Sequence, residues 1–525
     1  MRVTNVPSDN GQEIPGQAAA GQLGRRRFLA AGGAAAALIG APSARSLIGA
    51  PSARSLIGAP SRRAGRLGPT PKTGINRAAI GSWTAPFNLG LVSIHAVMLH
   101  TGNVLLFSWP KNTVGSDAVL WNPVSGEITN IALTYQRDIF CSGTSVLADG
   151  RVFIAGGHIY QGAIQPTQGV ANTTIFDPAS NSWTEGPVMS QARWYPTTTM
   201  LGDGTMMIFA GTMSTGTSAT NVDHYDPVSN TITTLPSTAN KSMVLYPRVK
   251  LLTSGLLAWT NFPTTCYLNP ATAAWTNGPT LNSGSRSDTD MSVLLPGLTT
   301  IMEMGGTLTS GVTGTAELLN LSASTPAWQY TASMNFPRLW ANSVLLADGT
   351  VLVVGGGTTG YYGGPVLTPE IYNPVTGTWS QLAPQTAPRM YHSTALLLPD
   401  GRVLSAGQSS GQYENTGEIF SPPYLFMGAR PVISNAPGTL GYGQAFTVAT
   451  PQAASISRVA LVKAAAVTHS NDFDQRYVTC TFTISGGTLL VTSPPNANYA
   501  PPGWYMLFLV NSTGVPSVAS WVQVG

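Results

Sequence analysis

Short apolar segments joined by glycine-containing turns recur through the middle of the chain. The recurring phrase is an apolar strand, an Asp-Gly or similar turn, a second apolar strand and often a Gly-Gly pair, as in Asp149-Gly-Arg-Val-Phe-Ile-Ala-Gly-Gly157. Successive turn glycines are 48, 54, 51, 42, 52 and 52 residues apart, and they are Gly102, Gly150, Gly204, Gly255, Gly297, Gly349 and Gly401. A period of about 50 residues is typical of kelch repeats.

A second phrase, an Asp-Pro or Asn-Pro turn that is usually followed by Trp, comes after most of the first phrases. Examples are Asp177-Pro178 with Trp183, and Asn373-Pro374 with Trp379. Two hairpins per period predict a four-stranded blade. The repeats therefore predict a seven-bladed kelch-like β-propeller over residues 80–428, in which residues 80–90 add a strand to the last blade.

The period stops after Pro422-Pro423-Tyr424, and a different pattern begins. Residues 429–525 contain alternating or apolar strand-like runs, such as Val459-Ala-Leu-Val462 and Thr488-Leu-Leu-Val-Thr492, between Pro and Gly turns. This pattern predicts a C-terminal Ig-like β-sandwich and completes an all-β fold.

The N-terminal region has the pattern of an export signal. Arg25-Arg-Arg-Phe-Leu29 precedes an Ala-rich run over 30–41 that is too short to span a bilayer, so we expect no membrane span. The alternative is a basic patch beside an Ala-rich helix. We expect a twin-arginine-type signal over 1–45, a low-complexity repeat linker over 46–79, and a secreted or cell-surface protein.

Composition narrows the class of protein further. Only 9% of the 525 residues are charged, while 57 Gly and 39 Pro favour strands and turns over charged helices. Residues 1–66 contain nine Arg and two acidic residues, so the remaining chain has 17 basic and 20 acidic residues. We therefore expect no nucleic-acid partner, and we expect a monomer.

Several reactive side chains share one position in the repeat. Cys141, Tyr195 and His392 each lie nine residues before a turn glycine, and Tyr391 directly precedes His392. In a propeller this position starts the innermost strand, so repetition brings the side chains to one mouth of the channel. Neighbours on a strand face opposite ways, so Tyr391 and His392 can reach one centre only if the strand end bends or a metal lies beyond it. Each residue alone could equally be ordinary packing.

Four motifs together carry a family resemblance: Asp138-Ile-Phe-Cys141, Arg193-Trp-Tyr195, Arg389-Met-Tyr391-His392, and Thr468-His469-Ser. With them, residues 80–525 resemble the copper radical oxidases of the galactose oxidase/glyoxal oxidase family. Arg-Trp-Tyr and Thr-His-Ser are closer to the glyoxal oxidase branch.

The resemblance implies a complete copper site. It implies that Tyr195 is joined to Cys141 by a thioether and holds a radical, that Tyr391 is an axial ligand and general base, and that His392 and His469 are equatorial ligands. His469 would arrive on a loop of the C-terminal domain. The implied reaction oxidises a small alcohol, aldehyde or carbohydrate with O2 and yields hydrogen peroxide. Two imidazoles and a phenolate suit Cu(II).

Other residues are weaker candidates. Arg286, Trp340 and Tyr246 are candidates for substrate binding, although Tyr246 could equally pack at the rim. In the galactose oxidase branch a Trp after the following Gly-Gly shields the cross-linked Tyr. The corresponding stretch here is Gly211-Thr-Met213, so Trp340 is the candidate to stack there. Cys266 and Cys480 could pair or be buried thiols, and we favour buried thiols.

Two other functions compete with the oxidase. One is a non-catalytic kelch-type surface or glycan-binding protein with a vestigial copper site. The other is a zinc hydrolase using His392 and His469, for which no nearby carboxylate base is evident. The complete set of Cys, two Tyr and two His favours the oxidase, because a binding module needs none of that chemistry.

Overall fold

The computed structural model describes residues 76–525 except 111–114, 134–136, 160–167, 288 and 410. Asn76–Gly525 form one compact unit. The predicted export signal and the linker up to residue 75 lie outside the described residues. Helical segments are short in the described part, and they are α2 (Arg77–Ile80), η1 (Ser237–Ala239), η2 (Pro423–Phe426) and η3 (Ala453–Ser455).

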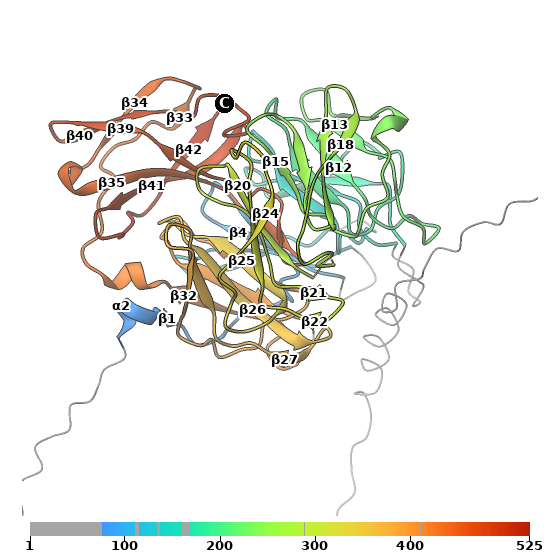
Figure 1. Cartoon of the computed structure of the whole chain (residues 1–525), viewed down its shortest axis with the longest axis horizontal. Coiled ribbons are helices and arrows are strands. Elements are labelled where there is room, and N and C mark those ends of the chain that lie inside the picture. The colour runs from blue at the N-terminus through green and yellow to red at the C-terminus, as the bar shows by residue number, and fades with distance from the viewer. Residues whose placement is uncertain (1–75, 111–114, 134–136, 160–167, 288, 410) are drawn as a thin grey trace, which may run out of the picture. The chain divides into compact units, whose positions relative to one another are not determined.

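Antiparallel sheets with a common set of four strands follow one another along the chain, and in all but the last of them the four strands are neighbours in the order in which they occur in the sequence. Figure 1 shows three strands of this region, β12, β13 and β18, in green. The sheets of the first half are β3–β4–β5–β6 (His95–Met98, Val104–Phe107, Ala118–Trp121, Ile128–Asn130), β7–β8–β9–β10 (Gly143–Val146, Val152–Ala155, Thr173–Asp177, Ser182–Glu185), β11–β12–β13–β14 (Thr197–Met200, Met206–Phe209, Asp223–Asp226, Thr231–Thr234) and β15–β16–β17–β18 (Val249–Leu251, Leu257–Trp259, Thr264–Asn269, Ala274–Thr280).

The same pattern continues in the second half. Its sheets are β19–β20–β23–β24 (Met291–Leu294, Thr300–Met304, Ala316–Asn320, Trp328–Thr331), β25–β26–β28–β29 (Leu339–Leu345, Val351–Thr359, Glu370–Asn373, Thr378–Gln381) and β30–β31–β32–β1 (Ser393–Leu397, Val403–Gly407, Thr416–Ser421, Ser82–Trp83). Short additions are β2 (Phe87–Asn88), β21 (Thr307–Leu308), β22 (Gly311–Val312) and β27 (Gly363–Pro365). First strands contact one another from sheet to sheet, among them β7 with β11, β11 with β15, β25 with β30 and β30 with β3.

The N-terminal strand confirms the prediction made for residues 80–90. β1 and β2 both pair with β32, with Trp83 opposite Phe420 and Phe87 opposite Gly417. The Trp83 indole nitrogen donates to the Ala383 carbonyl at 2.8 Å. Thus the segment before the first repeat completes the sheet of the last one.

The turn glycines behave as the repeat predicts. All of them have φ between 82° and 96°, a region that favours glycine because it has no side chain. At one such turn the Gly150 amide donates to the Leu147 carbonyl, and the Asp149 carboxylate accepts from the Arg151 amide. The local sequence therefore specifies each of these hairpins.

The C-terminal residues form two further sheets. One is five-stranded, β33–β42–β41–β35–β38 (Thr439–Leu440, Ser520–Val524, Gly503–Asn511, Ile456–Lys463, Tyr477–Cys480), and the other is β34–β40–β39 (Ala445–Ala449, Thr488–Thr492, Phe482–Ser485). Their strands gather in one region, in orange to red (Figure 1).

One hairpin leaves these sheets. β36 (Ala466–Thr468) and β37 (Asn471–Asp472) extend the first sheet instead, because β36 pairs with β3. The sequence predicts a single sandwich over 429–525, whereas the structure assigns this hairpin to the propeller-like sheets. It satisfies the backbone groups on the free edge of β3.

Buried ion pairs repeat from sheet to sheet. In four sheets an Arg before the first strand donates to a backbone carbonyl in or directly after the second strand and to an acid on the third. Both partners of each pair are fully buried, and the pairs are Arg193–Asp223, Arg286–Glu317, Arg338–Glu370 and Arg389–Glu418. Arg286 is therefore not available to substrate, contrary to the sequence-based expectation, because Glu317 and the carbonyls of Gly305 and Thr315 occupy its guanidinium.

Breaking one of these pairs should destabilise the fold. We expect Arg338→Met to lower the free energy of unfolding by about 3–5 kcal/mol, since it leaves Glu370 charged, buried and without its partner. Urea denaturation followed by tryptophan fluorescence measures the change. Arg151→Met is the control, because the Arg151–Asp149 pair is exposed and should contribute less than about 1 kcal/mol. Equal losses in the two variants would contradict the prediction.

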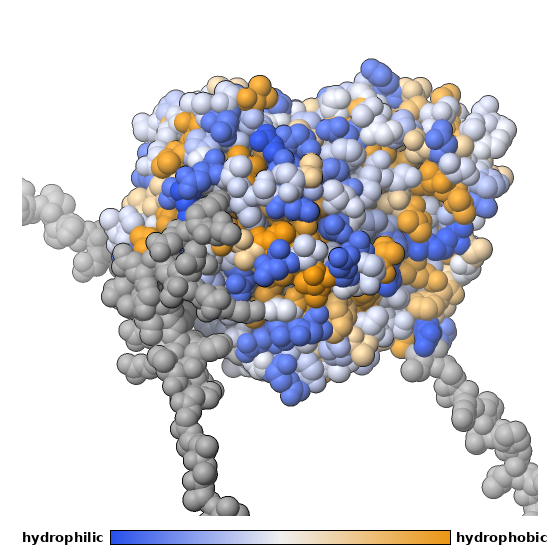
Figure 2. Space-filling model, turned by 180° about the vertical axis from the view of Figure 1, so that it is seen from behind, coloured by the Kyte–Doolittle hydropathy of each residue, from blue (hydrophilic) through white to orange (hydrophobic). Residues whose placement is uncertain are grey.

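The surface and the thiols complete the description. Hydrophobic and hydrophilic residues are interspersed over the face shown in Figure 2, and the most exposed apolar residues are single valines such as Val124 and Val228 in hairpin turns. Cys266 and Cys480 are free buried thiols, as favoured above. Within the described residues, no helix has the length and apolarity needed to cross a membrane.

Candidate metal centre

Five of the residues that lie nine positions before a turn glycine share an unusual backbone conformation. Cys141, Tyr195, Tyr246, Trp340 and His392 all have φ between 46° and 66°. Positive φ is costly for side chains of this size, and such residues cluster at functional sites. The Tyr195 amide donates to the Cys141 carbonyl at 2.9 Å, and the Tyr246 amide donates to the Tyr195 carbonyl at 3.0 Å. The shared register therefore places Cys141, Tyr195 and Tyr246 side by side.

This conformation lets Tyr391 and His392 face the same centre. β30 begins at Ser393, so both residues precede the regular strand. The positive φ of His392 bends the backbone, and the two rings stack with centroids 3.8 Å apart. Strand alternation would have separated them, and the bend at the strand end removes that conflict.

His469 reaches the site at the tip of the β36–β37 hairpin. Thr468 pairs with Asn471, so His469 and Ser470 form the two-residue turn, and both have positive φ. That is the pattern of a type I′ hairpin turn. A tight hairpin turn of the C-terminal region thus carries His469 to the site.

The five side chains converge. The Cys141 sulfur lies 3.8 Å from Nε2 of His392 and 3.5 Å from Nε2 of His469. The hydroxyls of Tyr195 and Tyr391 share a short hydrogen bond. The ring of His469 lies 4.8 Å from that of Tyr195 and 5.4 Å from that of Tyr391, measured between centroids. Residues up to 328 positions apart in sequence therefore meet in one buried cluster.

Burial sets the protonation of these groups. It lowers the pKa of His392 to about 3 and, with the His392 and His95 charges, lowers that of His469 well below its usual value. It raises the pKa values of the Tyr195 and Tyr391 phenols and of the Cys141 thiol. Neutral imidazoles retain a lone pair, so both histidines are prepared to bind a metal.

Hydrogen bonds fix which nitrogen of His469 faces the cluster. The Thr468 hydroxyl donates its proton to the Ile94 carbonyl at 2.7 Å, so it accepts from Nδ1 of His469 at 2.6 Å. Nε2 of His469 therefore carries the free lone pair and faces the Cys141 sulfur.

His95 supports the site without joining it. Its Nε2 accepts from the Cys141 amide at 3.1 Å, its Nδ1 lies 3.5 Å from the Thr144 hydroxyl, and its ring stacks on Phe107. His95 therefore orients the Cys141 backbone.

The aromatic neighbours differ from the sequence-based expectation. The ring against Tyr195 is that of Trp194, with centroids 3.9 Å apart, whereas Trp340 lies 4.8 Å from Tyr391. Tyr246 is buried 4.7 Å from Tyr195 and donates its hydroxyl to the Ser142 carbonyl at 2.9 Å. Trp194 was missed as a shielding residue although the Arg-Trp-Tyr motif contains it, because neighbours on a regular strand would point apart.

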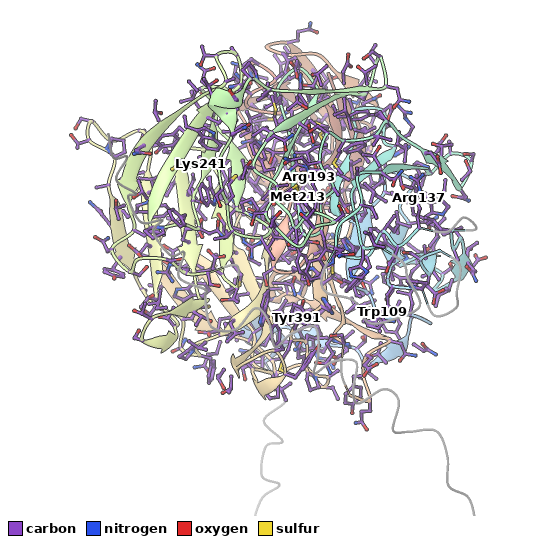
Figure 3. All side chains as sticks on the ribbon, turned by 90° about the vertical axis from the view of Figure 1, so that its right-hand side faces the viewer. Trp109, Arg137, Arg193, Met213, Lys241 and Tyr391 are labelled. Atoms are coloured by element: carbon purple, nitrogen blue, oxygen red, sulfur yellow. The ribbon has the colours of Figure 1, made fainter. Side chains whose placement is uncertain are left out.

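Further rings line the site on the side of His392 and Tyr391. Phe140 lies 5.3 Å and Trp109 6.2 Å from His392, while Tyr361 lies 4.7 Å from Tyr391. Trp109 and Tyr391 are half-buried and lie toward the same edge of the view in Figure 3. Trp109 and Tyr361 lie outside both the motifs and the register of the ligands, whereas Phe140 lies in the Asp138-Ile-Phe-Cys141 motif but was not singled out as a site residue.

Residues after His469 anchor the hairpin to several sheets. Asp474 accepts from the Val146 amide of β7 at 2.7 Å and from Lys463 at 2.9 Å, and Gln475 accepts from the Leu294 amide of β19. The Arg476 guanidinium donates to the Leu251 carbonyl of β15 at 3.0 Å. The hairpin therefore bridges first strands of different sheets.

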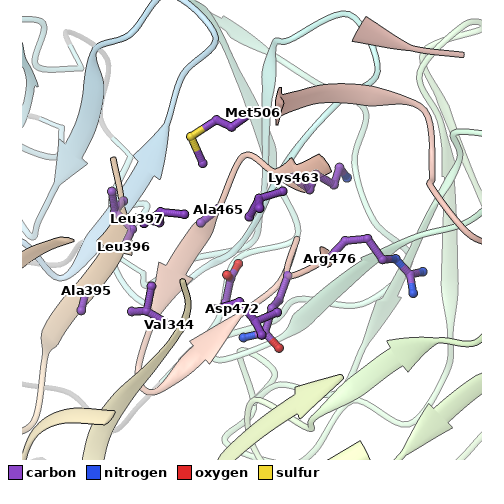
Figure 4. A pocket seen from close by; sticks show the side chains of 12 residues that line it. Val344, Ala395, Leu396, Leu397, Lys463, Ala465, Asp472, Arg476 and Met506 are labelled. Carbon is purple, nitrogen blue, oxygen red and sulfur yellow. The ribbon is translucent and has the colours of Figure 1, made fainter. Parts of the chain in front are cut away.

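Little space remains around this anchor. Two cavities of about 20 and 30 Å³ lie between the hairpin region and the first strands, and Lys463, Gln475 and Arg476 line both. Figure 4 shows Asp472, Lys463 and Arg476 around the smaller one. Each has room for little more than one water molecule, so a substrate does not fit there.

The residues present fit a copper ion. Cys141, His392 and His469 offer ligand atoms within 4.8 Å of one another, and the two tyrosine hydroxyls adjoin them. Nε2 of His392 and Nε2 of His469 both face the Cys141 sulfur, and the hydrogen bond from Nδ1 of His469 to Thr468 leaves Nε2 of His469 with a free lone pair. Imidazole and phenolate donors are suited to Cu(II).

Comparisons with known proteins identify the family. Residues 110–424 match the glyoxal oxidase N-terminus model, and residues 430–524 match the galactose oxidase-like early set domain. A galactose oxidase of Gibberella zeae is 29% identical over 85% of this chain and 71% of its own, and aldehyde oxidase GLOX of Vitis pseudoreticulata is 32% identical over 75% and 83%.

A solved structure agrees with these relatives. A fungal alcohol oxidase of the AA5 family, in complex with copper, superposes with a TM-score of 0.74 at 26% identity, covering 85% of this chain and 99% of its own. Together with the convergent cysteine, tyrosines and histidines, these matches show that the chain belongs to the galactose oxidase/glyoxal oxidase family of copper radical oxidases.

Proposed function

We propose that this protein oxidises a primary alcohol or an aldehyde with O2, giving the aldehyde or acid and hydrogen peroxide. The observation that carries the proposal is the convergence of Cys141, Tyr195, Tyr391, His392 and His469 in one buried cluster. We further propose that the four-stranded sheets close as a seven-bladed propeller over 80–428 and that 429–525 form an Ig-like domain, which the sheet order supports.

The proposed roles follow from the electron count. Oxidising an alcohol to an aldehyde removes two electrons and two protons. The two electrons and the two protons all pass to O2, which becomes hydrogen peroxide. A bound copper ion would supply one one-electron couple, and its charge would favour the phenolate form of a tyrosine beside it. Tyr195 would store the other electron, because a phenol carrying an ortho sulfur is easier to oxidise. Trp194, whose ring centroid lies 3.9 Å from that of Tyr195, would keep water from the Tyr195 ring.

Tyr391 is the proposed general base. It is half-buried, while Tyr195 is buried, so the Tyr391 oxygen is the better placed of the two phenols to meet a substrate hydroxyl. A phenolate at this position would accept the hydroxyl proton. His392 and His469, held neutral by burial, would hold the metal.

The proposed cross-link has a balanced chemistry. A bond forms between the Cys141 sulfur and a ring carbon of Tyr195, and the S–H and C–H bonds break. The two electrons and two protons pass to O2, which becomes hydrogen peroxide. Cys141 and Tyr195 belong to one hydrophobic cluster, and the Tyr195 amide donates to the Cys141 carbonyl, so the reactants are already adjacent.

The cross-link gives the direct test of this function. After copper loading in air, the intact mass of the protein should fall by two hydrogen atoms, and Cys141→Ser should abolish the loss. Cys266→Ser is the matched control, since Cys266 is a buried thiol on β17 away from the cluster. Copper uptake with a free Cys141 thiol would instead favour direct thiolate ligation, which the distances of 3.5 and 3.8 Å also suit.

A substrate panel separates catalysis from binding. Peroxide release by the copper-loaded protein should appear with at least one alcohol or aldehyde among simple, aromatic and sugar alcohols. Copper uptake without peroxide would favour the glycan-binding alternative.

We also propose export by the twin-arginine route on the basis of Arg25-Arg26-Arg27. Replacing these with lysines should retain the protein inside the cell.

A further inference from the structure

One arginine breaks the pattern of the repeated buried ion pairs. Arg193, Arg286, Arg338 and Arg389 each pair with an acid on the third strand of their own sheet. Arg248, which directly precedes β15, pairs instead with Asp290, which directly precedes β19 of the next sheet. Its guanidinium is as fully buried as the others.

The freed donors of Arg248 point to the metal centre. Nη2 donates to the backbone carbonyl of His469 at 3.3 Å and to that of Asp290 at 2.8 Å. Nη1 donates to the Tyr246 carbonyl at 3.2 Å, and Nε donates to the Asp290 carboxylate at 3.2 Å. One guanidinium thus joins the tip of the C-terminal hairpin to the two sheets beside it.

The hydrogen bond from Arg248 to the His469 carbonyl holds the tip of the hairpin, which has few other backbone contacts. His469 and Ser470 form a two-residue turn with positive φ at both positions, so the local backbone has no regular strand partner. The Thr468 hydroxyl fixes the imidazole from one side, and Arg248 holds the carbonyl. A charged donor forms a stronger hydrogen bond to a buried carbonyl than a neutral donor does. Only the planar, forked guanidinium of an arginine reaches all of these acceptors at once.

We propose that Arg248 is a positioning residue that holds His469 in place for copper binding. This inference rests on the proposed function, since it assigns His469 as a ligand. Arg248 does not touch the reacting atoms, and it acts through the backbone of His469. Partners that orient a ligand typically change metal affinity by about 10- to 100-fold when they are removed.

The test compares copper binding in matched variants. Arg248→Lys keeps the charge and loses the fork, and we expect its Cu(II) dissociation constant to rise about 10- to 100-fold in a chelator competition. We also expect its Cu(II) electron paramagnetic resonance spectrum to differ from that of the wild type. Arg338→Lys is the control, because Arg338 is equally buried and paired but contacts carbonyls of its own sheet region, and it should leave both readouts unchanged.

Asp290→Asn covers the case in which Arg248→Lys fails to fold. It leaves His469 and Arg248 intact but removes the charge that orients the guanidinium, and it should weaken copper binding in the same direction. Wild-type affinity and spectrum in Arg248→Lys, or in Asp290→Asn if only that variant folds, would overturn the inference while leaving the oxidase intact. Failure of the wild-type protein to take up copper would overturn both.

Discussion

Tyr195→Phe should reduce peroxide production by at least about 1,000-fold, a rise of about 4 kcal/mol in the activation barrier. The variant keeps the ring that contacts Trp194 but loses the hydroxyl that hydrogen-bonds to Tyr391. Without a phenol, the proposed second electron store is gone, and a single one-electron couple cannot complete a two-electron oxidation. Initial rates with the best substrate of the panel measure the effect.

The control for this variant is Tyr330→Phe. Tyr330 lies on the outer strand β24, is 56% exposed, and should be neutral for activity. Equal turnover by Tyr195→Phe and the wild type would exclude Tyr195 as the redox residue. The intact mass of Tyr195→Phe offers a separate check, because the loss of two hydrogens should also disappear.

Asp474→Ala should cost about 3–5 kcal/mol of unfolding free energy, because it leaves Lys463 charged and buried without its partner. It also removes the acceptor for the Val146 amide of β7, so the anchor between the hairpin and that sheet is lost. Urea denaturation measures the stability. Copper affinity should fall in parallel, since Asp474 anchors the hairpin that carries His469.

Asp149→Ala is the matched control for this change. Asp149 forms an exposed pair with Arg151 in a hairpin turn and should contribute less than about 1 kcal/mol to that pair. Should Asp474→Ala prove as stable as Asp149→Ala, Lys463 would have found another partner, and the hairpin would not depend on this ion pair.

The hairpins of the repeat were predictable because their signals are local. A turn glycine with positive φ and the Asp side chain before it act within four residues, as at Asp149-Gly150. The pairing of β1 with β32 was also predictable, since an incomplete last repeat needs one more strand. The N-terminal signal and its export route stay predictions.

Within the site, the sequence identified the reactive residues through register and motif. It did not identify the supporting ones. Trp340, not Trp194, was the candidate to stack on Tyr195, and Arg286 was a candidate for substrate binding. The positive φ of Tyr195 brings the Trp194 ring against the Tyr195 ring. Arg286 forms a buried ion pair with Glu317 on β23.

The sequence by itself determined the strands, the turns and the common position of Cys141, Tyr195 and His392, since each depends on neighbours along the chain. Tertiary structure alone decided that His469 lies on a hairpin paired with β3. It also decided that Arg248 donates to the His469 carbonyl rather than to an acid of its own sheet. The physical reason is that these contacts join residues more than 200 positions apart, and their geometry depends on backbone bends and buried charge partners that local patterns do not encode.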